Sequence, residues 1–251
     1  MTNLRQRVLA REPLLGAFLT WPVEGHIDLL SLAGFDFVVL DTEHGSFNPE
    51  SVERMVRAAE GTQMGAVVRV PGCLAAAEAG RALDAGACGI LFPRADSDAS
   101  VRAAVESVKY APVGKRGLGG VRANRYAGVP LDHWVLEAND GTMIFVQIET
   151  AGALNAADEI AAQKWVDLLF VGPNDLSQAL GVPGRYDDPR YVAGVERVAH
   201  VSAEHGKAAG IMLRTADQIP ELRRLGYTLF TTSDRTLLAQ SAKAWRGALA
   251  R

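Results

Sequence analysis

The sequence predicts a single-domain α/β protein folded as a (β/α)8 TIM barrel. Short apolar runs alternate with segments of helical periodicity along the whole chain, which is the pattern of repeated βα units. The apolar runs lack polar alternation, so helices are expected to cover both faces of the sheet. The chain has 251 residues, 48% of them hydrophobic, which suits one barrel better than two small domains. No linker or internal repeat divides it, and residues 1–251 are predicted to form one domain.

Eight runs have the length and composition of buried strands. They are Leu14 to Thr20, Phe35 to Leu40, Ala66 to Val70, Gly89 to Phe92, Met143 to Ile148, Leu168 to Val171, Ala208 to Leu213 and Tyr227 to Thr231. Amphipathic segments lie between them, such as Pro49 to Gly61 and Ala216 to Leu225, the second of which ends before a glycine. Eight such units are the number that closes a barrel.

Both ends of the chain are predicted to be helical. Met1 to Glu12 is polar and resembles the start of a helix rather than a signal peptide, and no apolar stretch approaches membrane-spanning length. One apolar face recurs along Arg235 to Arg251, formed by Leu238, Ala242, Trp245 and Leu249. We expect this face to be buried, with the helix packing on a neighbouring subunit or exchanging with it.

Charge and cysteine content limit the partners and the compartment. A formal net charge of −3 provides no broad basic field, so a small-molecule substrate is favoured over nucleic acid or an anionic membrane. Cys73 and Cys88 lack a metal-ligand spacing and are predicted to be reduced, buried thiols. These features favour a cytoplasmic protein.

Two carboxylates follow neighbouring buried strands. Glu149 comes directly after Met143 to Ile148, and Asp175 follows Leu168 to Val171 by a short turn. Since reactive groups collect at the C-terminal ends of barrel strands, the two acids can share one hard cation there. Two oxygen donors, without histidine pairs or thiolates nearby, favour Mg²⁺, Mn²⁺ or a similar ion over structural zinc. The alternative is that each acid caps the helix that follows it.

An arginine and a histidine fall on the same predicted rim. Arg69 ends a strand of valines, and its forked guanidinium can hold a carboxylate in two hydrogen bonds. A structural ion pair with Asp41 is the alternative. His44 lies in a polar turn directly after a strand, where a neutral imidazole can remove or deliver a proton near pH 7.

The regular alternation breaks between the fourth and fifth strands. Residues Ala111 to Tyr126 form a long segment rich in glycine and arginine. Such a loop is either a solvated surface segment or a contact for a ligand or a neighbouring subunit.

Five strings in this order resemble the class II pyruvate aldolases of the HpcH/HpaI family. They are Val39-Leu40-Asp41-Thr42-Glu43-His44-Gly45, Val67-Val68-Arg69-Val70-Pro71, Leu83-Asp84-Ala85-Gly86-Ala87, Val146-Gln147-Ile148-Glu149-Thr150 and Val171-Gly172-Pro173-Asn174-Asp175-Leu176-Ser177. The resemblance spans nearly the whole chain. It implies a metal-dependent aldol reaction of pyruvate with an aldehyde, run mostly as cleavage of a 4-hydroxy-2-oxo acid.

The resemblance also implies residue roles. Glu149 and Asp175 would be the ligands of a divalent ion such as Mg²⁺, Mn²⁺ or Co²⁺, and Arg69 would bind pyruvate and steady its enolate. The remaining implied site residues are Gln147 as a hydrogen-bonding group, His44 as the base, Asp41 and Asp84 in its proton path, and Gly172, Pro173 and Asn174 around the pyruvate carboxylate. Asp84 would come from a neighbouring subunit of a homohexamer built as a trimer of dimers.

The part of the site that would bind the aldehyde, called the acceptor side below, is less clearly marked in the sequence. Asn174 stands where the family pattern leads us to expect serine or alanine. The residues that we expect to line this side are Trp21, Arg116, Arg122, Arg125 and the loop around Leu213. Several arginines there would suit an acidic or hydroxylated aldehyde.

Other enzyme and binding functions remain as alternatives. A Schiff-base aldolase needs a lysine at the rim, and none of the five lysines falls at the C-terminal end of a predicted strand. An acyl-CoA lyase of the citramalyl or malyl type would share the enolate chemistry, but the compact chain shows no added segment for CoA. A non-catalytic barrel that binds a keto acid is the third possibility, and it has no need of a base such as His44.

Overall fold

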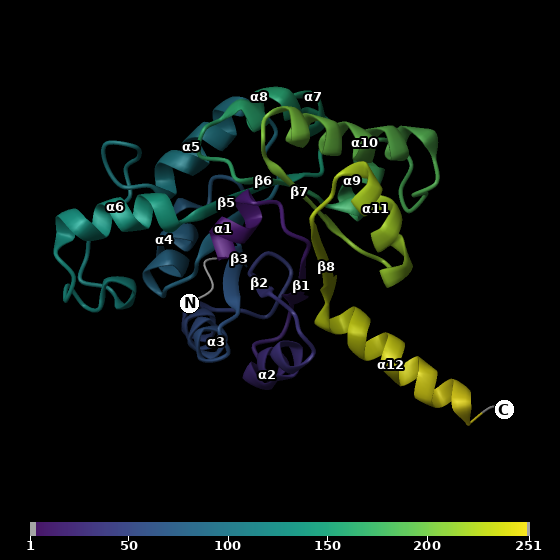
Figure 1. Cartoon of the computed structure of the whole chain (residues 1–251), viewed down its shortest axis with the longest axis horizontal. Helices are drawn as coiled ribbons and strands as arrows, with labels where there is room; N and C mark the ends of the chain where they lie inside the picture. Colours follow the sequence, from purple (N-terminus) through teal and green to yellow (C-terminus); the bar gives the residue numbers. More distant parts are fainter. Residues whose placement is uncertain (1–3, 250–251) are drawn as a thin grey trace.

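The computed structural model describes residues 4–249 as a closed barrel of eight parallel strands (Figure 1). Each strand pairs with the next in sequence, and β8 pairs with β1 to close the sheet. The strands are β1 (Leu14–Leu19), β2 (Phe37–Asp41), β3 (Gly65–Arg69), β4 (Gly89–Phe92), β5 (Met143–Ile148), β6 (Leu168–Val171), β7 (Ala208–Met212) and β8 (Leu229–Ser233). The predicted barrel is confirmed, and every predicted strand overlaps an observed one. The first three and last two residues of the predicted domain lie outside the described residues.

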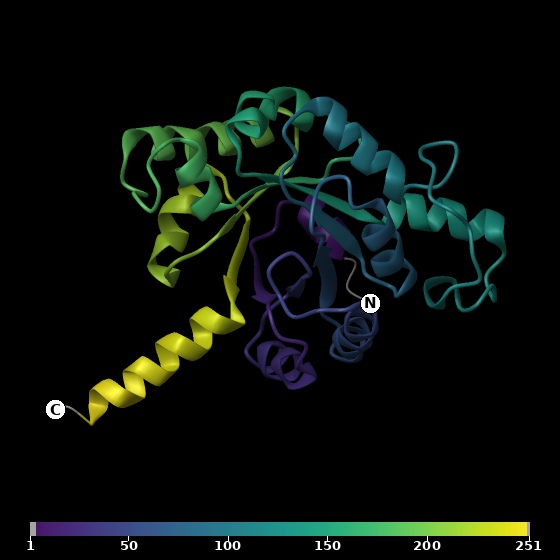
Figure 2. The ribbon, with the colours of Figure 1, turned by 180° about the vertical axis from the view of Figure 1, so that it is seen from behind.

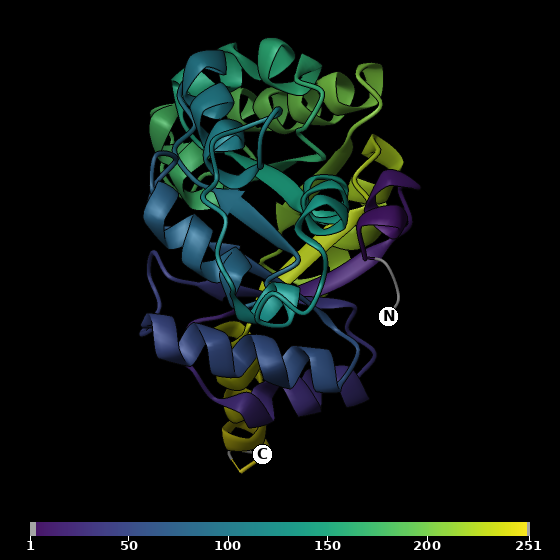
Figure 3. The same cartoon turned by 90° about the vertical axis from the view of Figure 1, so that its left-hand side faces the viewer.

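Helices surround the barrel and connect its strands (Figure 3). They are α1 (Leu4–Leu9), α2 (Glu24–Leu32), α3 (Pro49–Gly61), α4 (Ala76–Asp84), α5 (Asp98–Val108), α6 (Leu131–Gly141), α7 (Ala151–Asn155), α8 (Ala157–Ala162), α9 (Pro173–Ala179), α10 (Pro189–Glu204), α11 (Ile219–Leu225) and α12 (Asp234–Ala248), with short 3-10 turns η1 (Arg122–Asn124) and η2 (Ala216–Gln218). The helix predicted at residues 49–61 has the observed bounds. Asn48 and Ser51 form a reciprocal capping box at its start, which explains where it begins. Among residues 4–249, no helix is long and apolar enough to cross a membrane.

Side chains of the strands divide between two cores. In β2, Phe37 and Val39 point into the barrel, whereas Val38 and Leu40 pack under the surrounding helices. Successive side chains therefore alternate between the two faces of the sheet, and both faces are apolar. The unbroken apolar runs of the sequence predict this arrangement. Cys73 is buried and Cys88 half-buried, both as free thiols, and burial raises their pKa values to about 11 and 12.

The two ends of the barrel differ in what covers them. Figure 1 looks onto the N-terminal ends of the strands, where α1 lies across the barrel and its Leu4 and Val8 join the inner core. Figure 2 looks from behind onto the C-terminal ends, where the loop after β2 lies in front of the strands. The N-terminal end is therefore covered by a helix, whereas the C-terminal end carries the loops that follow the strands.

Helix α12 leaves the barrel and extends away from it (Figures 1 and 2). Its apolar residues Leu238 and Trp245 are 59% and 78% exposed, and Leu249 directly after it is 79% exposed. The predicted helix is confirmed; its apolar face is exposed in the single chain, and its packing on a neighbouring subunit stays a prediction. An apolar stripe of this kind is ordinarily covered by another surface.

Candidate active site

A cleft of about 120 Å³ opens at the C-terminal rim of the barrel. Residues from seven of the eight strand ends, all but that of β4, reach it. Its lining residues are Phe18, Thr20, Asp41, His44, Arg69, Gln147, Phe170, Gly172, Pro173, Asn174, Asp175, Met212, Ser233 and Arg235. Most of the predicted site residues thus meet in one place, because parallel strands of a barrel end at the same rim.

Glu149 is a buried carboxylate directly beside this cleft. One carboxylate oxygen accepts a hydrogen bond from the backbone N–H of Arg94 (2.8 Å), and the other accepts a short one from the amide of Gln147. Burial, assisted by the like charges of Asp175 and Glu43, raises the pKa of Glu149 to about 7. Without a bound cation, this environment therefore disfavours the ionised form of Glu149.

The donor set fits a hard divalent cation. Glu149 and Asp175 supply carboxylate oxygens, and the Oε1 atom of Gln147 is buried without a hydrogen-bond partner. Oxygen donors of this kind are those that Mg²⁺ and Mn²⁺ accept. No cluster of three or more histidine, cysteine, aspartate or glutamate side chains suited to a metal was found within the described part of the chain. Two carboxylates would leave positions of an octahedral ion open for substrate.

Gly172 lets the chain pass close to these side chains. A Cβ atom at this position would lie 2.7 Å from Nε2 of Gln147 and 2.9 Å from Oε2 of Glu149. Only glycine allows so close an approach. On the opposite side of Glu149, Arg94 adopts a left-handed backbone with φ of 52°, which accompanies the hydrogen bond from its N–H to the carboxylate.

Arg69 is held by two acids. Its Nε and one terminal nitrogen donate to the two oxygens of Asp41 at 2.9 and 2.7 Å, and its other terminal nitrogen lies 3.4 Å from Glu43. The structural ion pair considered from the sequence is therefore present. It fixes the plane of the guanidinium at the rim, and Arg69 still lines the cleft.

His44 projects from the turn after β2 with about half of its side chain exposed. Its backbone N–H donates to Asp41 (3.1 Å), which fixes the turn, and its Nε2 lies 3.9 Å from a carboxylate oxygen of Glu43. Glu43 thus contacts the histidine and two arginines, Arg69 and Arg94, at once. The sequence-based hypothesis did not include Glu43, although its position between the two singled-out residues Asp41 and His44 was a usable signal.

Asn174 lies in the first turn of helix α9, on the other side of the cleft. Its side-chain oxygen accepts a hydrogen bond of 2.6 Å from the hydroxyl of Tyr186. The ring of Tyr186 in turn lies under the guanidinium of Arg214, 4.1 Å from its centroid. The amide nitrogen of Asn174 is therefore the group left to face a ligand.

Several predicted site residues lie elsewhere in the chain. Asp84 ends α4 at the opposite end of the barrel, where it pairs with Arg116 (2.6 Å). Arg122 is at the same end, bonded to Glu60 and to the carbonyl of Ala85 (2.6 Å). Neither arginine lines the rim of its own chain, because the loop after α5 runs along the N-terminal end of the barrel.

Two apolar positions of the acceptor side also differ from expectation. Leu213 is buried in the outer core, and its neighbour Met212 lines the cleft instead. Trp21 lies at the rim with its ring edge-on to His26 and is not among the cleft-lining residues. Phe18, Phe170 and Arg235 complete the wall, and the sequence-based hypothesis included none of them.

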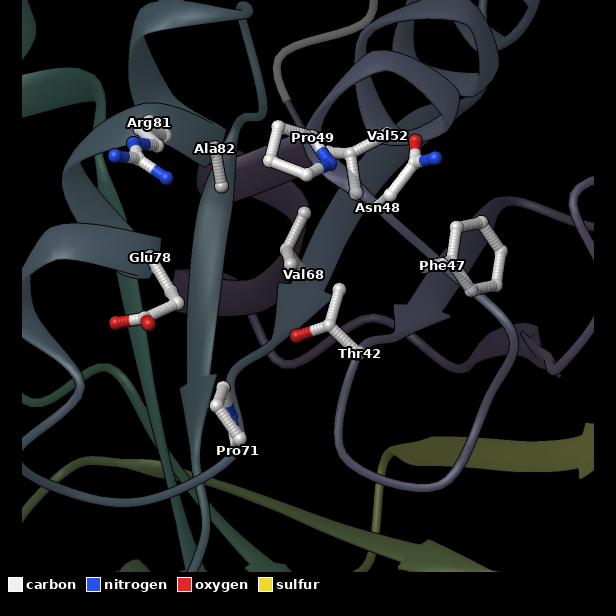
Figure 4. A pocket seen from close by; sticks show the side chains of 10 residues that line it. All are labelled: Thr42, Phe47, Asn48, Pro49, Val52, Val68, Pro71, Glu78, Arg81 and Ala82. Carbon is white, nitrogen blue, oxygen red and sulfur yellow. The ribbon is translucent and has the colours of Figure 1, made fainter.

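A second hollow of about 150 Å³ lies outside the barrel between α3 and α4 (Figure 4). In Figure 4, Glu78, Arg81 and Ala82 of α4 lie across from Pro49 and Val52 of α3. Its wall is mostly apolar, and it shares no lining residue with the rim cleft. The rim cleft is therefore the candidate active site.

Comparisons with known proteins agree with this geometry. The sequence model of the HpcH/HpaI aldolase/citrate lyase family matches residues 16–237. A hydroxypyruvate/pyruvate aldolase of Agrobacterium fabrum is 35% identical over 84% of this chain and 79% of its own length. A 4-hydroxy-2-oxo-heptane-1,7-dioate aldolase of Escherichia coli is 32% identical over 96% of this chain and 92% of its own. The crystal structure of an HpcH/HpaI aldolase/citrate lyase family protein from Burkholderia cenocepacia J2315 superposes with a TM-score of 0.93 over all of both chains, at 30% identity.

Proposed function

Because this chain belongs to the HpcH/HpaI aldolase/citrate lyase family and is a carbon–carbon lyase, we propose that it cleaves 4-hydroxy-2-oxo acids to pyruvate and an aldehyde and catalyses the reverse addition. The observation that carries the proposal is the buried Glu149, whose charge is opposed by its surroundings, beside Asp175, Arg69 and His44. This arrangement suits a reaction in which negative charge develops on a bound keto acid.

Glu149 and Asp175 are the residues that would hold a divalent cation. When bound, Mg²⁺, Mn²⁺ or Co²⁺ would stabilise the negative charge of the pyruvate enolate. Gln147 would orient Glu149 through their short hydrogen bond, and Arg94 would do so from the backbone.

Arg69 binds the keto acid in this proposal. Asp41 fixes the plane of its guanidinium at the cleft wall, from which it would donate to a carboxylate or an enolate oxygen. The first-turn N–H groups of α9, after Gly172 and Pro173, would donate hydrogen bonds to the pyruvate carboxylate, since such groups lack partners within a helix.

His44 moves the proton. In cleavage, the hydroxyl at C4 loses its proton as the C3–C4 bond breaks, the aldehyde leaves, and the bonding electrons pass into the enolate of pyruvate. Protonation of that enolate at C3 then gives the methyl group. His44 is the imidazole that lines the cleft, and its Nε2 lies 3.9 Å from a carboxylate oxygen of Glu43.

The assembly is part of the proposal. Asp84 lies at the wrong end of its own barrel to reach His44, so it would serve the site of a neighbouring copy. The exposed apolar residues of α12 would then exchange onto another copy, where Leu29 and Leu32 of α2 are 67% and 86% exposed. A homohexamer built as a trimer of dimers would satisfy both contacts.

A cytoplasmic location is also part of the proposal, because it accords with the two free thiols.

Mixed assemblies test the shared site. Asp84→Asn and His44→Ala chains are each expected to be poorly active alone. Co-refolded together, they should regain part of the activity, because some sites then combine an intact His44 with an intact Asp84. Mixtures no more active than their components would show that the two residues do not share a site.

The decisive experiment measures pyruvate release from a panel of 4-hydroxy-2-oxo acids, with chelator and with added Mg²⁺, Mn²⁺ or Co²⁺. We expect release that chelator abolishes and metal restores. Solvent deuterium exchange into the methyl group of pyruvate gives an independent readout that needs no acceptor. Release from a citramalyl or malyl thioester instead would favour the acyl-CoA lyase, and binding of pyruvate without exchange would favour a non-catalytic barrel.

A further inference from the structure

Arg235 lines the rim cleft from the first turn of α12. Its side chain is exposed, and no carboxylate pairs with its guanidinium among the ion pairs of residues 4–249. The other arginine of the cleft wall, Arg69, is already held by Asp41 and Glu43. Unlike Arg69, which the proposed function assigns to pyruvate, Arg235 is therefore an arginine of this cleft with no role assigned so far.

The first turn of α12 is fixed to the barrel, so the position of Arg235 is well defined. Asp234 is buried and accepts hydrogen bonds from the backbone N–H (2.8 Å) and hydroxyl (2.9 Å) of Thr20 at the end of β1. It also accepts the N–H of Arg235 (2.7 Å), while Ser233 caps the helix by accepting from Thr236. A side chain carried on so rigid a turn can select a ligand by its charge.

Between β6 and β8, Asp175 is the acid among the cleft-lining residues, and it is a proposed ligand of the cation. From β6 to β8, this arc presents Asn174, Met212 and Arg235, whereas the proposed pyruvate-binding groups come from β2, β3 and β5 and from the start of α9. Asn174 is oriented by Tyr186, which leaves its amide N–H groups for the cleft. Two hydrogen-bond donors, one of them charged, thus flank an apolar methionine.

We infer that Arg235, together with the amide of Asn174, selects acceptor aldehydes that carry an anionic group beyond the carbonyl. The inference rests on the proposed function and specifies its acceptor. A carboxylate and a phosphate share the required chemistry, since either can accept the two N–H groups of a guanidinium fork. The anion would lie at the cleft mouth, while the carbonyl carbon faces the nucleophilic carbon of pyruvate.

The test compares aldol addition of pyruvate to three aldehydes: a four-carbon aldehyde ending in a carboxylate, a three-carbon aldehyde ending in a phosphate, and butanal. For the wild type, kcat/KM should be at least about tenfold higher for an anionic acceptor than for butanal, and this preference should weaken at high salt. Which anionic acceptor is preferred distinguishes the carboxylate from the phosphate. Arg235→Gln should lower the preference at least about tenfold and remove its salt dependence.

Two further variants make the result specific. Arg235→Lys keeps the charge without the fork and should retain part of the preference. Arg246→Gln, a change of the same kind farther along α12, should retain all of it. Exchange of pyruvate protons by the wild type is measured in parallel: no exchange would overturn the proposed function and this inference with it. Exchange with the same acceptor preference in wild type and Arg235→Gln would overturn the inference alone.

Discussion

Buried charges are treated differently at the two ends of this barrel. At the N-terminal end, Asp167 accepts hydrogen bonds from Arg5 (3.0 Å) and from the N–H of Ile144 (2.9 Å), and Lys109 donates to two backbone carbonyls. At the C-terminal rim, Glu149 is buried near other acids, and Gln147 has a buried oxygen with no partner. Asp167 therefore has a cationic partner that supports the fold, whereas Glu149 has none within residues 4–249, as expected of a carboxylate that binds a cation.

The largest effect is expected from Glu149→Gln at the rim. Loss of this carboxylate removes a proposed ligand of the cation, and metal-dependent kcat should fall about 10³-fold or more. Stability of the metal-free protein should not fall, because the change removes a buried charge that its neighbours oppose. Steady-state kinetics and urea unfolding measure the two outcomes. A variant that kept full metal-dependent turnover would exclude Glu149 from the cation site.

At the N-terminal end of the barrel, Asp167→Ala should lower the stability of the protein and leave its activity unchanged. It removes the acceptor of the Ile144 N–H and leaves the half-buried Arg5 with only the exposed Asp140 (3.4 Å), so the free energy of unfolding should fall by roughly 3 kcal/mol. The activity of the folded protein should be unchanged, since Asp167 lies far from the cleft. Urea unfolding and kcat per folded molecule test this pair of expectations. Loss of turnover in a fully folded variant would contradict the division between the two ends.

His44→Ala separates proton transfer from binding within the rim. Deuterium exchange into pyruvate should fall about 10²-fold, which is the usual contribution of a positioned acid–base group. Pyruvate binding should change much less, because Arg69 and the start of α9 would still hold the carboxylate. The two readouts are exchange by NMR and pyruvate affinity by calorimetry. Equal losses in both would assign His44 a binding role.

The predicted part of the site follows from strand order. Once eight strands are recognised, Arg69, Gln147 and Asp175 must meet at one rim, whatever the details of packing. Which residue of a strand faces the cleft is harder to predict from the sequence. Residues 208–213 are small or apolar at every position, so no alternation of polarity indicated that Met212, and not Leu213, faces the cleft.

Longer segments were less predictable for other physical reasons. The loop carrying Arg116 and Arg122 could run along either end of the barrel, and only its ion pairs with Asp84 and Glu60 show which end it takes. Helix α12 has the periodicity of a helix with one buried face, but periodicity does not say which chain buries it. Arg235 was missed because its approach to the cleft depends on the anchored turn at Asp234.

The smallest expected effect concerns Lys109, the other buried charge of the N-terminal end. Its amine donates to the carbonyls of Asn139 (2.5 Å) and Thr142 (2.8 Å) and lies over the ring of Trp165. Lys109→Met leaves both carbonyls without a donor, so the free energy of unfolding should fall by about 2 kcal/mol at pH 7. Activity of the folded protein should not change.

The stability difference between the wild type and Lys109→Met should also depend on pH, which makes the test sharper. Burial lowers the pKa of Lys109 from 10.5 to about 8, so between these pH values the unfolded chain binds more protons than the folded one. The contribution of Lys109 to the free energy of unfolding therefore rises with pH across that window, by up to about 1.4 kcal/mol per pH unit. The neutral amine retains two hydrogens for its two carbonyls, so the contacts survive deprotonation. Urea unfolding from pH 7 to 10 should show the advantage of the wild type over Lys109→Met increasing with pH. A constant difference would mean that Lys109 keeps ordinary basicity despite its burial.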